Sequence, residues 1–120
     1  MTNQAAKNLR QLNDFLWTNY ERNLPPSGTA RLAVILRTRT EDDAALAAQV
    51  LKRMRCKEVD ISKQGWWLAR RWAVVAETEP LQLARPVIDE WSQSILQSLE
   101  GTSAELAHWV PLWESPDAGA

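Results

Sequence analysis

Few side chains in this sequence could carry out chemistry. His108 is the only histidine and Cys56 the only cysteine among 120 residues, so the chain holds too few ligands for a histidine or thiolate metal site and cannot form an internal disulfide. Arg55 and Lys57 flank Cys56 and could lower the pKa of its thiol, but the sequence offers no resolving cysteine. We therefore predict no catalytic residue, no metal site and no cofactor.

An acidic run, Glu41-Asp42-Asp43, has the residue type that binds cations. It directly follows Thr40, and a hydroxyl residue followed by acidic residues is typical of a helix start, where the carboxylates interact favourably with the helix dipole. Helix capping therefore explains the run without a bound metal.

Aromatic and cationic side chains are better candidates for a binding site, because both kinds contribute strongly to protein interfaces. Trp66 and Trp67 are followed by Arg70 and Arg71. A second aromatic segment closes the chain and contains Pro111, which inside a strand-like run is typical of a sheet edge. From these two segments we predict a surface that binds a protein partner, made of Trp66, Trp67, Arg70, Arg71, His108, Trp109 and Trp113.

The elements that carry these residues follow from the spacing of apolar positions. Leu9, Leu12, Leu16 and Tyr20 recur at the spacing of an amphipathic helix. Residues 31–38 form a nearly continuous apolar run, which is typical of a central strand buried on both faces. The rest of the pattern predicts, in order, a helix that begins at Thr40, a hairpin over 58–77 with a turn at 62–65, a helix within 80–100 and a strand over 104–113.

This order predicts an α+β fold. After the first helix the elements run β-α-β-β-α-β, the ferredoxin-like arrangement, with a four-stranded antiparallel sheet in the order 4-1-3-2. A chain of 120 residues fits one domain, with the N-terminal amphipathic helix in 1–24, the core in 30–114 and a frayed tail over 115–120. Trp72 and Trp91 are expected inside the core. The sheet face opposite the two crossover helices could be covered by the N-terminal helix or by a second copy of the chain.

The charge is unevenly distributed although the net charge is only −1. Residues 52–71 carry seven cationic and two acidic side chains, and residues 80–120 carry one cationic and six acidic side chains; such asymmetry can steer a charged partner. The N-terminus has no cationic flank before an apolar block, and no window approaches the ~18 apolar residues of a membrane span. Together with the single cysteine, these features predict a soluble cytoplasmic protein that does not bind membranes.

The element order and two local patterns resemble the bacterial ribonuclease E inhibitor family known as regulator of ribonuclease activity B. Thr40-Glu41-Asp42-Asp43 resembles the start of that family's first crossover helix, and Lys57-Glu58-Val59 resembles the strand after it. In the closing strand, Glu105, Trp109 and the pair Trp113-Glu114 are similar to the family's pattern. The resemblance implies an N-terminal helix before a βαββαβ core, and a regulatory protein that inhibits a ribonuclease.

We therefore expect a small non-enzymatic regulatory module that binds a protein partner through its aromatic closing strand and its basic hairpin. Two alternatives remain open. A dimeric ferredoxin-like enzyme or ligand-binding protein would have a cavity near His108. An RNA-binding domain would stack bases on Trp66 and Trp67 and contact phosphates with Arg70 and Arg71. The sequence does not decide between a monomer and a homodimer.

Overall fold

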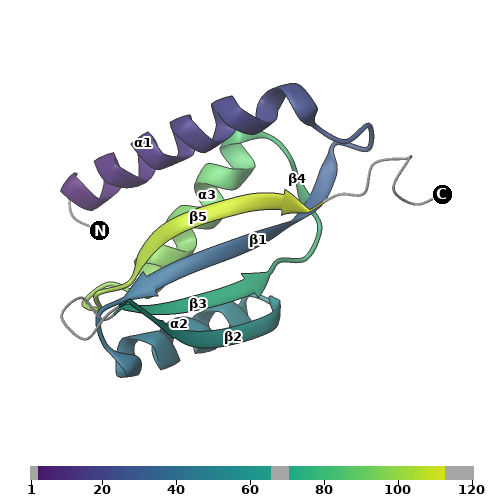
Figure 1. Ribbon diagram of the computed structural model, residues 1–120. Helices are drawn as coiled ribbons and strands as arrows, with labels where there is room; N and C mark the ends of the chain where they lie inside the picture. The colour runs from purple at the N-terminus through teal and green to yellow at the C-terminus, as the bar shows by residue number, and fades with distance from the viewer. Residues whose placement is uncertain (1–2, 66–70, 113–120) are drawn as a thin grey trace.

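The computed structural model describes residues 3–65 and 71–112 of the chain. Within these ranges it contains three α-helices, a short 3-10 helix and five strands (Figure 1). In chain order these elements are α1 (Asn3–Tyr20), η1 (Glu21–Asn23), β1 (Thr29–Thr38), α2 (Glu41–Arg53), β2 (Lys57–Gln64), β3 (Arg71–Glu77), β4 (Leu81–Gln82), α3 (Arg85–Ser98) and β5 (Glu105–Leu112).

The strands form one antiparallel sheet with β1 at its centre. β1 pairs with β3 and with β5, and β2 pairs with the other side of β3. The two-residue strand β4 pairs with Thr29 and Ala30, beyond the point where β3 ends. The α+β class, the antiparallel sheet and the N-terminal helix are thus confirmed, but the sheet has five strands and not the four that were predicted.

The extra strand has a local cause. Backbone hydrogen bonds continue from β3 as far as Thr78, whose N–H donates to the Leu32 carbonyl at 2.9 Å. The Thr78 hydroxyl also accepts a hydrogen bond from the Leu32 N–H. Pro80 follows and has no N–H to donate, so regular pairing with β1 stops and resumes at Leu81.

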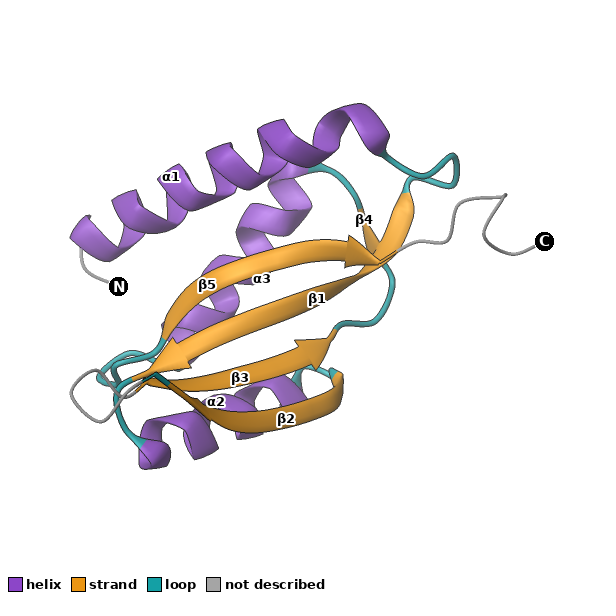
Figure 2. Cartoon of the chain, viewed as in Figure 1, coloured by secondary structure: helices purple, strands orange, loops and turns teal. Residues whose placement is uncertain are grey.

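The helices lie together on one side of the sheet. α2 and α3 lie behind the strands in the view of Figure 2, and α1 runs beyond β5, where it packs against both α3 and β5. Leu32, Val34 and Leu36 of β1 point toward the helices and are fully buried. They form one core with the apolar residues of all three helices, among them Leu16, Leu51 and Ile88.

The other sheet face carries no helix within the described part of the chain, and Figure 1 looks directly onto it. Along β1 the burial alternates: Arg31 and Arg37 are exposed, and Ala33 and Ile35 are only half-buried. The prediction that this strand is buried on both faces is therefore wrong. The reason is the position of α1, which packs beside α3 instead of crossing the opposite face.

Two tryptophans expected in the core lie at its margin. Trp72 and Trp91 are partly buried and pack against the core cluster. Trp72 is the first residue after Arg71 at the start of β3, and the Lys63 ammonium lies 5.8 Å from the centre of its ring. Their indoles therefore cover the edge of the core and do not fill its interior.

Candidate functional site

The structure describes three of the seven residues predicted to bind a partner. Arg71, His108 and Trp109 lie in β3 and β5. They do not form one surface, because Arg71 is exposed, His108 is half-buried and Trp109 is fully buried. The other four predicted residues lie outside the described residues, as does the tail over 115–120; these are Trp66, Trp67, Arg70 and Trp113.

Trp109 is a core residue, so the prediction of an exposed indole on an aromatic edge strand is wrong. Its register partner is Val34, which points toward the helices. Its indole N–H donates a 2.9 Å hydrogen bond to the side-chain oxygen of Asn13, and the ring of Tyr20 lies 5.7 Å from its own. β5 pairs with β1 alone, as expected of an edge strand, but α1 covers the indole.

A buried polar cluster joins α1 to α3 at this point. The Asn13 amide nitrogen donates to Asp89 at 2.9 Å and to the Ser92 hydroxyl at 3.0 Å. Arg85 donates to both oxygens of Asp89 and also to Asp14. The sequence signal for this cluster is a polar residue, Asn13, among the apolar positions of an amphipathic helix; it has the geometry of a structural anchor and not of a binding site.

His108 takes part in a contact that holds β5 against the end of α1. Its Nε2 lies 3.4 Å from the hydroxyl of Tyr20, and the two rings meet edge to face with centroids 6.5 Å apart. Neither the cavity at the start of β5 nor the shallow hollow beside Phe15 is lined by His108. The alternative of a ligand cavity near this histidine therefore gains no support.

The helix-free face of the sheet is one candidate surface. It presents apolar side chains from three adjacent strands, with Val75 36% exposed on β3 and Leu112 40% exposed on β5. Ile35 of β1 is in register with Val75, and Leu112 lies farther along the sheet, opposite Arg31; the half-buried pair Ala33 and Val110 lies between them. Charged residues surround this apolar strip at the ends of the strands; they include Arg31, Arg37, Arg71, Glu77 and Glu105.

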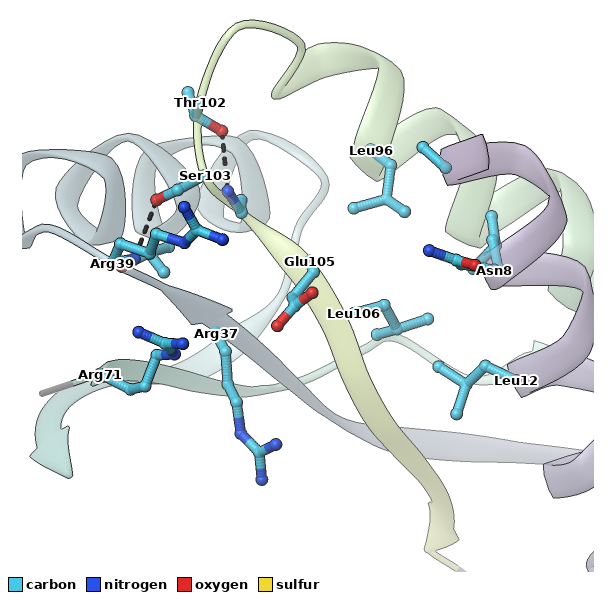
Figure 3. A pocket seen from close by; sticks show the side chains of 14 residues that line it. Asn8, Leu12, Arg37, Arg39, Arg71, Leu96, Thr102, Ser103, Glu105 and Leu106 are labelled. Atoms are coloured by element: carbon cyan, nitrogen blue, oxygen red, sulfur yellow. Dashed lines mark hydrogen bonds between the residues drawn. The ribbon is translucent and has the colours of Figure 1, made fainter. Parts of the chain in front are cut away.

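A cavity of about 400 Å³ opens at one end of the sheet, astride the first residues of β5. Figure 3 shows arginines on one side of this strand and leucines on the other. Its lining includes Arg37 of β1, Arg39 just after that strand, Arg71 of β3, and apolar residues of α1 and α3. No pattern in the sequence indicates this cavity, because its walls come from segments distant in the chain.

Cys56 and the acidic run do not form a reactive or metal-binding site. Burial, followed by the nearby charge of Glu79, raises the pKa of the Cys56 thiol to about 11, so its cationic neighbours do not activate it. The Thr40 hydroxyl caps α2 by accepting from the Asp43 N–H, as predicted. No group of three potential metal ligands occurs in residues 3–65 and 71–112.

Comparisons with known proteins leave the chain without an identified relative. No protein-family model matches it, and searches of curated proteins and of solved structures return no similar protein. No helix among the described residues is long and apolar enough to cross a membrane.

Proposed function

We propose that this chain is a small non-enzymatic module that binds another protein through the helix-free face of its sheet. One observation carries the proposal: Val75 and Ile35, then Ala33 and Val110, then Leu112 form a run of apolar side chains across three strands on a face that no described helix covers. Contiguous exposed apolar surface with a polar rim is typical of interaction sites. Arginines at the strand ends suit the rim of such an interface.

The composition of this face favours a protein over RNA. Single-stranded RNA is held largely by stacking of bases on aromatic rings. The described residues of β1 and β3 on this face are aliphatic or charged, and the indole of Trp72 is on the side of the helices, opposite Thr38. His108 is the only ring that the described part of β5 contributes here, and it contacts Tyr20.

Two finer expectations belong to the same proposal. The four longer strands pair in the order β2-β3-β1-β5, which supports a ferredoxin-like core extended by β4. The likeness of Thr40-Glu41-Asp42-Asp43 and of the closing strand to ribonuclease E inhibitors supports a regulatory role in the cytoplasm, with a ribonuclease as the partner.

The test compares two substitutions that add the same charge to different surfaces. Val75→Glu places a carboxylate in the apolar strip, and Leu46→Glu places one on α2, where Leu46 is 45% exposed. Both variants should remain folded by circular dichroism, since both positions are exposed. Val75→Glu should lose the capture of purified ribonuclease E by immobilised protein, and Leu46→Glu should retain it.

Equal capture by Val75→Glu and the unsubstituted protein would refute the role of this face. Capture of RNA but not of ribonuclease E would overturn the protein-binding function itself. Self-capture between two differently tagged copies, lost in Val75→Glu alone, would show that the face binds a second copy of the chain, and would refute the regulatory role.

A further inference from the structure

The cavity at the start of β5 has one wall of positive charge. Arg37 is exposed and is the last residue but one of β1, and Arg39 follows the strand. Neither guanidinium has an ion pair with any residue in the ranges that the structure describes. Arg71 of β3 lines the same wall. Three arginines face one acidic lining residue, Glu105, so the lining has an excess of positive charge.

The acidic residue of α2 at this end of the sheet forms no ion pair with Arg37 or Arg39. Asp43, which reaches the same end of the sheet from α2, accepts hydrogen bonds from the hydroxyl and the backbone N–H of Ser103, at 2.6 and 2.9 Å. Ser103 in turn accepts from the backbone N–H of Arg39 at 2.8 Å. These contacts fix the backbone position of Arg39, and its guanidinium remains available to a ligand.

The opposite wall is mostly apolar, with Asn8 of α1 as a polar member. Leu12 of α1, Leu96 of α3 and Leu106 of β5 converge on it, and Figure 3 shows all three on the far side of β5 from the arginines. Leu12 and Leu96 are only half-buried, so an apolar group placed here would remove further area from water. At about 400 Å³ the cavity is within the size range of small-molecule sites, ~300–1,000 Å³.

We propose that this cavity binds a small amphipathic anion, a carboxylate or phosphate with a short apolar chain. Guanidinium groups bind both kinds of oxyanion through paired N–H donors, and they do so more strongly where water is partly excluded. Arg39 holds the anionic head, Arg37 adds positive charge to the same wall, and the chain lies across β5 against Leu12, Leu96 and Leu106. The inference does not depend on the proposed protein partner.

The probes are octanoate and octyl phosphate. Acetate and inorganic phosphate, which lack the apolar chain, and octanol, which lacks the anionic head, serve as partial ligands. Binding is measured by titration of the amide signals in two-dimensional NMR spectra. We expect saturable shifts at Leu12, Leu96 and Leu106 with at least one full probe, and at least tenfold weaker binding of every partial ligand. Inorganic phosphate that binds as tightly as octyl phosphate, or octanol as tightly as octanoate, would overturn the proposal.

A matched pair of double variants tests the arginines. Arg37→Gln with Arg39→Gln removes two charges from the cavity, and Arg31→Gln with Arg53→Gln removes two exposed charges elsewhere. The first should weaken binding of the preferred probe at least tenfold, and the second should change it less than twofold. Equal weakening of binding in both double variants would show that only the net charge of the protein matters, and would refute the role of these arginines. Absence of saturable binding to the unsubstituted protein would refute the site.

Discussion

The indole N–H of Trp109 donates a 2.9 Å hydrogen bond to the side-chain oxygen of Asn13, and both side chains are buried. The Asn13 amide nitrogen donates to Asp89 and Ser92, so one side chain links β5, α1 and α3. No buried side-chain nitrogen or oxygen in the described parts of the chain lacks a hydrogen-bond partner. A polar network that is complete can fix the packing of neighbouring elements, because any alternative packing would leave its groups unsatisfied.

Asn13→Ala should therefore destabilise the protein. It leaves the indole N–H of Trp109 without its acceptor, and the loss of one partner from a buried hydrogen bond costs about 1–3 kcal/mol. Asn19→Ala changes an exposed asparagine of the same helix and should alter the free energy of unfolding by less than about 0.5 kcal/mol. Urea denaturation of both variants measures the difference. Equal stability of the two variants would mean that the cluster does not hold α1.

Adjacent valines of β3 test which face of the sheet is covered. Val74 is fully buried beneath the helices, whereas Val75 is 36% exposed on the helix-free face. Val74→Ala should lose about 2 kcal/mol, from about 0.8 kcal/mol for each buried methylene equivalent plus the cavity left behind. Val75→Ala should lose less than about 1 kcal/mol. A larger loss for Val75→Ala in chemical denaturation would show that something covers this face in solution.

Local signals in the sequence predicted most of the elements, and the packing between them was harder to predict. The start of α2 could be predicted from Thr40 and the acidic residues after it, because a helix cap is made by residues that are neighbours in sequence. The burial of Trp109 and the open side of β1 both depend on where α1 packs, and the apolar stripe of α1 fits either face. Pro111 correctly indicated an edge strand, but it carries no information about a helix that covers the neighbouring indole.

The candidate site was less predictable than the fold. The tryptophan-arginine pairs attract attention because they are adjacent in the chain. Arg37 and Arg39 carry no such signal, since isolated arginines at a strand end are normally solvated. Their convergence with Leu12 and Leu96 arises only when α1 and α3 pack beside β5, a contact between segments that are far apart in sequence.

The Asp43–Ser103 contact predicts a pH effect on the acid side. The Ser103 hydroxyl and then its backbone N–H lower the pKa of the Asp43 carboxyl below its usual 3.8. Because the pKa of Asp43 is lower in the folded state than in the unfolded state, its carboxylate stabilises the fold at a pH above the unfolded pKa of about 3.8. This stabilisation is lost as the pH falls from about 3.8 through the pKa of the folded state. Ser103→Ala should raise the pKa of Asp43, measured by carboxyl NMR titration, and Ser98→Ala, on the exposed face of α3, should leave it unchanged. The same pKa in all three proteins would contradict the contact.

Cys56 predicts the opposite effect on the alkaline side. Its thiol is 8% exposed, and burial, with the charge of Glu79, raises its pKa from 9.0 to about 11. A raised pKa in the folded state means that the neutral thiol is favoured by folding. Its contribution is complete below pH 9 and is lost as the pH rises from about 9 to about 11.

Cys56→Ala removes this ionisable group and no other. The unsubstituted protein has a thiol that ionises more readily in the unfolded state than in the folded state, and the variant has none. The unsubstituted protein should therefore lose more stability than the variant between pH 8 and about pH 10.5, as measured by urea denaturation at each pH. Alkylation of the folded protein by iodoacetamide at pH 8 should also be slow, since the thiolate is the reactive form. A stability difference that stays constant across this pH range, together with rapid alkylation, would show that Cys56 is accessible and that its thiol is not held neutral by burial.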